Sequence, residues 1–344
     1  MTANSHLHFY VGTYTDAPSN SSGIAHITLN PETGELTRLD DAITLRNPSY
    51  LAATKQGVYA FSEVAREEGA ALNFISSATS QALPIAGDYP CHLDIKAPYL
   101  AVANYGSGNV SVYQLDGNGG PLDAIGELYV EGSGPNKDRQ LSPHAHQVTF
   151  LKSSNHLAIV DLGTDSVHFF GYSSDADKPA FALDQSIAMP AGSGPRHLVF
   201  NQSETTAYVV CELSETLVVL TNSKTGWQVT HQCDLLAETP NGEAASAIRL
   251  STDEKYLYVS CRAQNKISHF NVSGEVPRRL AAYDCGGAFP RDFIISADGK
   301  WLLTANQHSN NIASFHRNSE TGELAPTGYQ CNVDAPVCLV EIAK

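Results

Sequence analysis

One histidine, one glutamate and three arginines stand at repeated positions in the chain and could together bind an anion and move a proton. These residues are His146, Arg196, Glu212, Arg262 and Arg291. Arginine binds carboxylates and phosphates through paired hydrogen bonds, and histidine and glutamate are frequent general acids and bases. Lysine and arginine make up only 21 of the 344 residues, so three arginines near one site favour recognition of a small anion.

The positions of these residues follow from a pattern that recurs along the chain. The segment Pro195–Phe200 reads as a short strand, and a polar turn separates it from an apolar run at Ala207–Cys211. A third run, Leu217–Leu220, follows after another turn. Short β-rich runs bounded by turn residues predict an antiparallel hairpin that continues into a sheet.

The same pattern begins at seven anchor positions, about 42 to 55 residues apart. The anchors are Pro48, Pro90, Ala145, Pro195, Ala245, Pro290 and Pro336. No segment shows a sustained helical period, and units of this length match the four strands of a propeller blade. The sequence therefore predicts an all-β chain that folds as a seven-bladed β-propeller.

The two ends of the chain supply one blade between them. A single strand, expected at 337–342, follows the last anchor, and no anchor precedes the first strands. Those first strands are expected at 7–12, 24–29 and 36–39. We therefore expect the C-terminal strand to join the N-terminal strands in one blade, which removes an exposed sheet edge. Residues 1–344 are expected to form a single domain.

The register of the repeat predicts where each polar residue lies. In a blade, the first strand borders the central channel and the second strand returns to the face where the first began. His146, Arg196 and Arg291 directly follow anchors, so they open first strands. Glu212 and Arg262 follow the ends of second strands. We therefore predict that all five side chains gather at one mouth of the channel.

Four further residues near this mouth are candidates for binding a substrate. They are His144, His197, Asn104 and Asn306. Each has a structural alternative, because histidines can pack between blades and asparagine side chains cap turns. Glu212 and Arg196 have one too, since buried arginine and glutamate can form an ion pair that only supports the fold.

The charge and the N-terminal residues argue against several partners. The net charge of −15 disfavours binding to nucleic acid or to anionic membranes. Residues 1–16 lack a basic start followed by an apolar run, so we expect no secretory signal. No stretch reaches the roughly 20 apolar residues of a membrane span. We expect a cytoplasmic protein whose partner is a small anionic molecule, and the oligomeric state stays open.

The cysteines and histidines predict no metal site. The seven cysteines are scattered and show no CxxC spacing, which favours buried free thiols over a disulfide framework or a zinc site. Neither an HExxH motif nor an EF-hand loop occurs. His144 and His146 could share a face of one strand, but no carboxylate partner is evident. We therefore predict no metal and no other cofactor.

Several stretches of the sequence resemble one known family. They are FYVGTYT (9–15), NPETGEL (30–36), SPHAHQVTF (142–150), GSGPRHLVF (192–200), CEL (211–213) and FPRDFIISADGKWLLTANQ (289–307). Over essentially the whole chain the sequence resembles the bacterial lactonase family of seven-bladed propellers. That family includes propeller-type 6-phosphogluconolactonases and, more distantly, the fungal 3-carboxymuconate lactonising enzyme.

The resemblance implies a lactonase whose catalytic residues lie at the channel mouth. The matching residues here are His146, Arg196, Glu212 and Arg262, while Cys211 and Cys261 stand where the family often has asparagine. It implies hydrolysis of a sugar lactone, foremost 6-phosphogluconolactone, with His146 or Glu212 as the general base. Two alternatives stay open: an enzyme that lactonises or isomerises a carboxymuconate, and a propeller that binds a ligand without catalysis.

Overall fold

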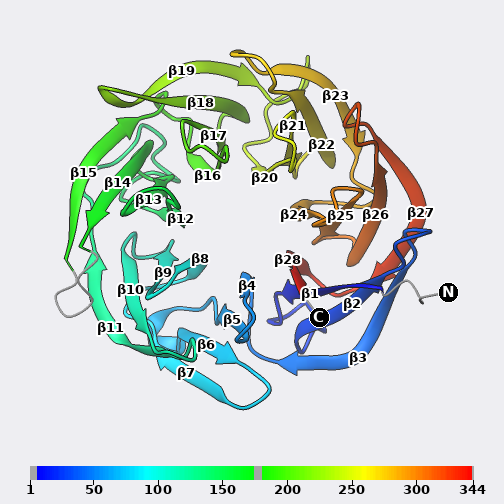
Figure 1. Cartoon of the computed structure of the whole chain (residues 1–344), viewed down its shortest axis with the longest axis horizontal. Helices are drawn as coiled ribbons and strands as arrows, with labels where there is room; N and C mark the ends of the chain where they lie inside the picture. The colour runs from blue at the N-terminus through cyan, green and yellow to red at the C-terminus, as the bar shows by residue number, and fades with distance from the viewer. Residues whose placement is uncertain (1–5, 174–179, 343–344) are drawn as a thin grey trace. The chain divides into compact units, whose positions relative to one another are not determined.

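Short runs of apolar and β-branched residues form strands over almost all of the chain (Figure 1). The computed structural model describes residues 6–173 and 180–342. Contacts within the chain divide it into two compact units. The first unit holds Met1–Lys55 and Leu235–Lys344, and the second holds Gln56–Asp234. That the whole chain forms a single domain stays a prediction.

Three sheets of the described chain lie wholly in the first unit, and each has four antiparallel strands. The sheet ordered β28-β1-β2-β3 contains β28 (Pro336–Ile342), β1 (Leu7–Thr13), β2 (Gly23–Leu29) and β3 (Leu36–Thr44). The next contains β20 (Ala245–Leu250), β21 (Tyr256–Cys261), β22 (Lys266–Asn271) and β23 (Arg278–Asp284). The third contains β24 (Pro290–Ile295), β25 (Trp301–Asn306), β26 (Asn311–Arg317) and β27 (Leu324–Asn332).

Three further four-stranded sheets of the described chain lie wholly in the second unit. The first contains β8 (Pro90–Lys96), β9 (Tyr99–Asn104), β10 (Val110–Leu115) and β11 (Pro121–Leu128). The second contains β12 (Ala145–Phe150), β13 (His156–Asp161), β14 (Ser166–Tyr172) and β15 (Phe181–Ala188). The third contains β16 (Pro195–Phe200), β17 (Thr206–Cys211), β18 (Thr216–Ser223) and β19 (Gly226–Asp234).

One more four-stranded sheet has the strand order β4-β5-β6-β7. Its strands are β4 (Leu51–Ala53), β5 (Val58–Phe61), β6 (Ala71–Ile75) and β7 (Ser80–Pro84), with a short 3-10 turn, η1 (Arg66–Glu68), between β5 and β6. The described strands thus form seven sheets of four strands each. The predicted number of units and their strand content are confirmed.

The C-terminal strand completes the N-terminal sheet, as predicted. Figure 1 shows β28, in red, beside β1, in blue. The two strands pair antiparallel from His8–Ile342 to Thr13–Pro336. This pairing satisfies the backbone groups along one edge of β1, which would otherwise be open to another chain.

The inner and outer strands of a sheet differ in sequence for a physical reason. Strand β17, TAYVVC, is buried along nearly its whole length. Strand β23, RRLAAYD, alternates exposed and half-buried residues after its exposed start. An alternating pattern is typical of a strand with one face in water, whereas a continuous apolar run indicates burial on both faces. The polar residues that follow inner strands such as β17 therefore enter a largely dry environment.

The core lies between neighbouring sheets within each unit. In the second unit Phe169 of β14 stacks on Trp227 of β19, with ring centroids 5.3 Å apart and planes 4° apart. Cys211 is buried in the same cluster. All seven cysteines are among the described residues, and each is a free thiol. The prediction of free rather than disulfide-bonded cysteines is confirmed.

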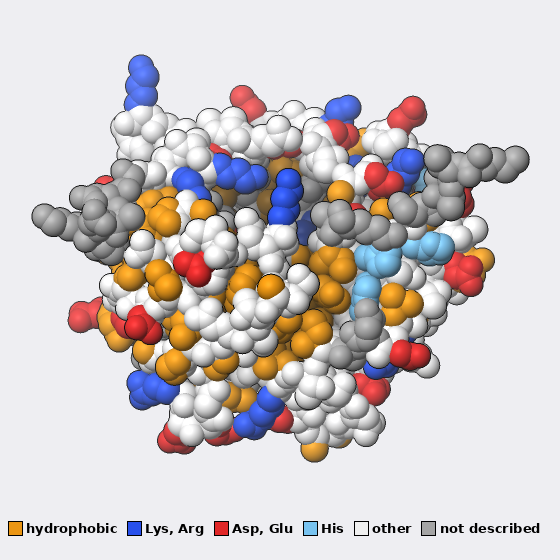
Figure 2. Space-filling view, turned by 60° about the horizontal axis from the view of Figure 1, so that its bottom comes forward, with side chains coloured by type: hydrophobic (Ala, Val, Ile, Leu, Met, Phe, Trp, Pro, Cys, Tyr) orange, Lys and Arg blue, Asp and Glu red, His pale blue; other side chains and the backbone are white. Residues whose placement is uncertain are grey.

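The surface carries no dominant basic face in the view of Figure 2, where Lys and Arg side chains lie scattered among Asp and Glu. Within 6–173 and 180–342, no helix is long and apolar enough to cross a membrane.

One histidine of the first unit is completely buried. His269 is 0% exposed, and its ring lies flat on Tyr258, 4.9 Å between centroids. Neither ring nitrogen has a hydrogen-bond partner among the described residues. Burial, together with the charge of Arg317, lowers the pKa of His269 to about 4.

We expect stability to fall as the pH drops from about 6.5 to about 4, because the unfolded chain binds this proton more readily. The neutral His269 ring thus makes the free energy of unfolding up to about 3 kcal/mol higher above this pH window than below it. His269→Phe keeps the stacked ring and cannot be protonated, so its urea midpoint should fall less between pH 7 and pH 4. An identical pH dependence in the variant and the wild type would contradict this prediction.

Candidate active site

The first strands of several sheets begin with a sharp backbone turn. Tyr89, Gly194 and Phe289, each before a proline anchor, have φ values of 51°, 60° and 64°. A left-handed conformation is strained for a residue with a bulky side chain. Such strain persists only where surrounding contacts impose it, and it is common at functional sites.

A β-bulge follows this turn and sets one residue apart from the ladder. The pairing of β12 with β13 skips His146. The corresponding pairings skip Arg196 in β16, Arg291 in β24 and Cys91 in β8. A bulge leaves its extra residue out of register and changes the direction of its side chain. The position after each anchor, which the repeat singled out, is thus distinguished by the backbone itself.

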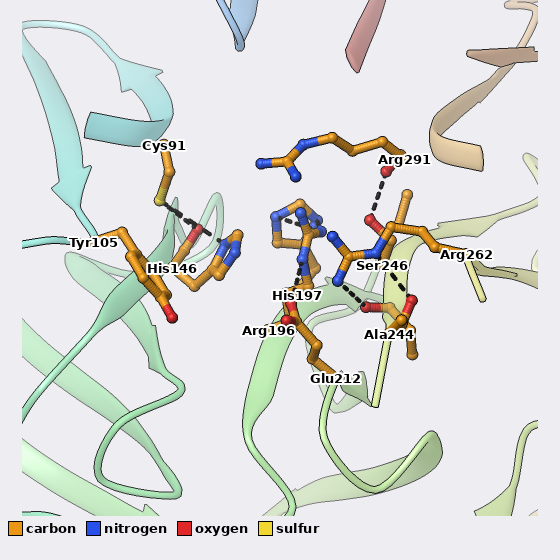
Figure 3. Close-up of polar contacts among 12 residues, drawn as sticks. Cys91, Tyr105, His146, Arg196, His197, Glu212, Ala244, Ser246, Arg262 and Arg291 are labelled. Atoms are coloured by element: carbon orange, nitrogen blue, oxygen red, sulfur yellow. Dashed lines mark hydrogen bonds and ion pairs between the residues drawn. The ribbon is translucent and has the colours of Figure 1, made fainter. Parts of the chain in front are cut away.

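Arg196 and Glu212 form a buried ion pair in the second unit (Figure 3). Nε of Arg196 lies 3.0 Å from Oε2 of Glu212, and the two side chains are 4% and 6% exposed. The opposite charges of the two groups attract each other across this short distance. Little water is present to screen that attraction. The pair therefore fixes the guanidinium of Arg196 beside the carboxylate.

A second arginine, Arg139, binds the other oxygen of Glu212. Its Nη2 donates to Oε1 of Glu212 at 2.8 Å and to the hydroxyl of Tyr105 at 3.2 Å. Burial alone would lower the pKa of Arg139, but the hydrogen bonds to Glu212 and Tyr105 outweigh it and raise that pKa. Both carboxylate oxygens of Glu212 therefore face a guanidinium.

His197 lies next to Arg196 and contacts two further buried histidines. The ring of His197 contacts those of His146 and His92 edge-on, with centroids 5.2 and 5.4 Å apart. Nη1 of Arg196 lies 3.3 Å from both ring nitrogens of His197. The rings of Tyr105 and His146 also meet edge to face, with their centroids 5.3 Å apart. Among the described residues, no group of three or more His, Cys, Asp or Glu could hold a metal ion.

Cys91, the bulged residue of β8, packs against His146 (Figure 3). Its thiol donates to the backbone carbonyl oxygens of His146 and Ala145 at 3.4 and 3.5 Å. Its Sγ lies 3.9 Å from Nδ1 of the His146 ring, which is a long contact. The thiol therefore supports the backbone that carries His146.

His144 supports Tyr105. Its backbone N–H donates to Oδ1 of Asp161 at 2.7 Å, and its Nδ1 lies 2.7 Å from the carbonyl oxygen of Tyr105. The two rings stack with centroids 4.7 Å apart. These contacts orient the tyrosine that holds Arg139. Substrate contact by His144 stays a prediction.

A single turn positions both Arg196 and Glu212. Gly194 directly precedes the anchor of β16, and its carbonyl accepts the backbone N–H of Glu212 at 2.7 Å. The carboxylate of Asp165 accepts the N–H groups of Gly192 and Gly194 at 2.6 and 2.8 Å. A Cβ on Gly194 would lie 2.5 Å from the side chain of Leu213. Glycine is therefore required where the turn brings the ion pair together.

In the first unit, each predicted arginine is held by an aromatic ring. Arg262 donates from Nε to the carbonyl of Ala244 at 2.9 Å and lies 5.1 Å from the ring centroid of Phe289. Arg291 donates to the hydroxyl of Tyr14 at 2.7 Å and lies 5.2 Å from its ring. A ring face attracts a guanidinium. That these arginines share one mouth with the second unit's residues stays a prediction.

A cleft of the first unit lies beside Tyr14, the partner of Arg291. It measures about 470 Å³ and is lined by residues that include Tyr14, Asp16, Pro18, Gln307, His308 and Asp334. The ring of His308 stacks on Phe289 at 3.9 Å. Burial, with repulsion from Arg262 and Arg291, lowers the pKa of His308. The cleft is large enough for a sugar-sized molecule.

The two predicted asparagines lie inside their own sheets. Asn104 and Asn306 are both 0% exposed. Asn104 donates to Oγ of Ser111 at 3.0 Å, and Asn306 donates to the carbonyl of Cys285 at 3.2 Å. These contacts favour the turn-capping alternative and lend no support to substrate binding.

Sequence reasoning missed Tyr105 and Arg139, and it left His92 out of the candidate site. Tyr105 follows the end of β9 as Glu212 follows the end of β17, so the repeat could have identified it. His92 stands in β8 where His197 stands in β16. Arg139 lies in the loop between β11 and β12, which follows no period. Only the folded loop shows that it reaches Glu212.

The sequence as a whole matches a known family model. The model described as Lactonase, 7-bladed beta-propeller matches residues 8–341. The chain belongs to this family. The seven four-stranded sheets are therefore the blades of this fold, and the predicted fold class and family are confirmed.

Relatives in this family include named enzymes. A 6-phosphogluconolactonase of Bacillus subtilis (strain 168) is 30% identical over 350 residues, which cover 96% of this chain and 97% of the relative. A crystal structure of a Bacteroides fragilis protein proposed to be a 6-phosphogluconolactonase has a TM-score of 0.91 and 33% identity, and covers 100% of this chain and 99% of its own. The structure of a periplasmic gluconolactonase of Pseudomonas aeruginosa has a TM-score of 0.87 and 27% identity, with 98% and 99% coverage.

Proposed function

We propose that this protein is a lactonase that hydrolyses a sugar lactone, with 6-phosphogluconolactone as its substrate and 6-phosphogluconate as its product. The proposal rests chiefly on the buried Arg196–Glu212 pair, next to the histidine rings, in a chain of the lactonase family. Relatives that carry the name 6-phosphogluconolactonase support this sugar. The arginines support an anionic substrate.

Opening the ring ester requires an activated water and a stabilised oxyanion. Water attacks the carbonyl carbon, the ring C–O bond breaks, and the leaving ring oxygen takes up a proton. We assign His146 to accept the proton from water and to deliver it to the leaving oxygen. Glu212 suits this role less well, because both its oxygens already face guanidinium groups.

Arg196 is assigned to the oxyanion of the tetrahedral intermediate. A cation that is fixed before the reaction stabilises the developing charge without reorganisation. Glu212 holds the guanidinium from its Nε side and thereby positions it. Arg262 and Arg291 stay predicted contacts of the substrate.

The seven free cysteines support a reducing compartment for this activity. We therefore retain the cytoplasm as the proposed location. One relative of known structure, at 27% identity, is a periplasmic gluconolactonase, so localisation of a tagged full-length chain is the direct test.

Acid release from freshly generated 6-phosphogluconolactone, corrected for spontaneous ring opening, tests the proposal. The wild type should accelerate it, and Arg196→Ala should lower kcat about 10²- to 10³-fold, the usual loss for an oxyanion donor. Arg66→Ala, on the exposed turn η1, should match the wild type. The proposal is wrong if the wild type gives no acceleration, or if it consumes a carboxymuconate and leaves the lactone untouched.

A further inference from the structure

The loop between β11 and β12 is built to present one arginine. Gln140 is 0% exposed, and its Nε2 donates to the carbonyl of Leu162 at 2.8 Å and to Oδ1 of Asp165 at 2.7 Å. Its backbone N–H donates to the carbonyl of Asn136 at 2.8 Å. These bonds fix the residue next to Arg139, so the position of the arginine does not depend on a flexible loop.

Asp165 links this loop to the site. The same carboxylate that binds Gln140 also accepts the N–H groups of Gly192 and Gly194. The turn of Gly194 positions Glu212 through a backbone hydrogen bond. Arg139 and Glu212 are therefore placed by one shared buried group.

Arg139 uses only part of its donor capacity within the protein. Its guanidinium contacts, to Glu212 and Tyr105, both come from Nη2. The side chain is 35% exposed, whereas that of Arg196 is 4% exposed. A guanidinium carries five N–H donors, so the N–H groups of Nε and Nη1 remain available to another acceptor. They lie on different edges of the guanidinium, so each would make its own charge-assisted hydrogen bond to an anion.

The charges around Glu212 leave one positive charge in excess. Arg139 binds Oε1 and Arg196 binds Oε2, so two guanidinium groups share one carboxylate. An anionic group of the substrate would balance the second charge. A purely structural pair would need only one of them.

We propose that Arg139 is a specificity residue of the active site, which binds the phosphate group of a phosphorylated sugar lactone through its remaining N–H groups. This inference rests on the proposed function, and it names the group that separates a phosphorylated substrate from a plain gluconolactone. Tyr105 and Glu212 both hold Nη2 of the guanidinium and so keep its other N–H groups in place.

Steady-state kinetics on two substrates test the proposal. For Arg139→Ala we expect KM for 6-phosphogluconolactone to rise about 10- to 100-fold, the loss of charge-assisted hydrogen bonds to the phosphate. The kcat/KM for unphosphorylated glucono-δ-lactone should fall clearly less than that for 6-phosphogluconolactone, since the unphosphorylated substrate lacks the phosphate. Arg139→Lys keeps the charge but loses the planar guanidinium, so its KM should lie between those of the wild type and Arg139→Ala. Lys137→Ala removes a charge from an exposed residue of the same loop and should behave as wild type.

Binding of the product separates this proposal from the proposed function. Calorimetry should show that 6-phosphogluconate binds the wild type and Lys137→Ala, and binds Arg139→Ala at least about tenfold more weakly. Binding lost with Arg139 in a protein that hydrolyses neither lactone would support the inference while the proposed function fails. Equal losses on both lactones, or unchanged phosphate selectivity, would overturn the inference while the lactonase activity stands.

Discussion

Replacing His146 with asparagine is expected to lower kcat for lactone hydrolysis by about 10²- to 10⁴-fold, the range typical of a lost general base. His146 is the bulged residue of β12, and its ring contacts Tyr105 and His197. Asparagine is polar and smaller, and it cannot take up a proton from water. KM should change little, because the binding groups remain.

His156→Asn is the matched control for this prediction. His156 begins β13 in the same sheet, is about one-third exposed and pairs with Asp184 on the outer strand β15. It should keep the wild-type kcat. A His146→Asn protein with wild-type turnover would return the role of base to Glu212, which the sequence alone left as an alternative.

Replacing Glu212 with glutamine is expected to destabilise the fold by about 3 to 5 kcal/mol, because it leaves the buried charge of Arg196 without its counter-ion. The Arg196 side chain is only 4% exposed, so water cannot replace the carboxylate. The backbone of Glu212 should keep its bond to Gly194. Urea denaturation of the wild type and the variant at one pH measures the loss.

Two comparisons isolate the buried pair. Asp284→Asn breaks a pair with Lys266 in which the Asp284 side chain is 88% exposed and that of Lys266 is 36% exposed. This substitution should lower the free energy of unfolding by less than about 1 kcal/mol. The double variant Arg196→Met with Glu212→Leu removes both charges and should recover part of the stability, since apolar replacements of a buried pair are often neutral. The double variant should be inactive in lactone hydrolysis, because it lacks Arg196. If Glu212→Gln is as stable as the wild type, the ion pair is not a structural element of the site.

The sequence alone determined the repeat and, through it, the strands. The run expected at 207–211 is β17, Thr206–Cys211, and the strand expected at 337–342 is β28, Pro336–Ile342. Such agreement is possible because apolar runs and turn residues are local properties that the chain repeats. The repeat also singled out His146, Arg196 and Arg291, and the structure shows that each stands where the backbone forms a bulge.

Tertiary structure decided which of these residues meet, and what else joins them. Arg139 and Glu212 are 73 residues apart in sequence, and they meet only because Gln140, Asp165 and the turn at Gly194 share buried hydrogen bonds. No local pattern encodes such a contact. Asn104 and Asn306 share the register of site residues, yet packing buries them completely. Residue type and spacing thus set the chemistry that the chain can offer, whereas burial and long-range hydrogen bonds determine which side chains can use it.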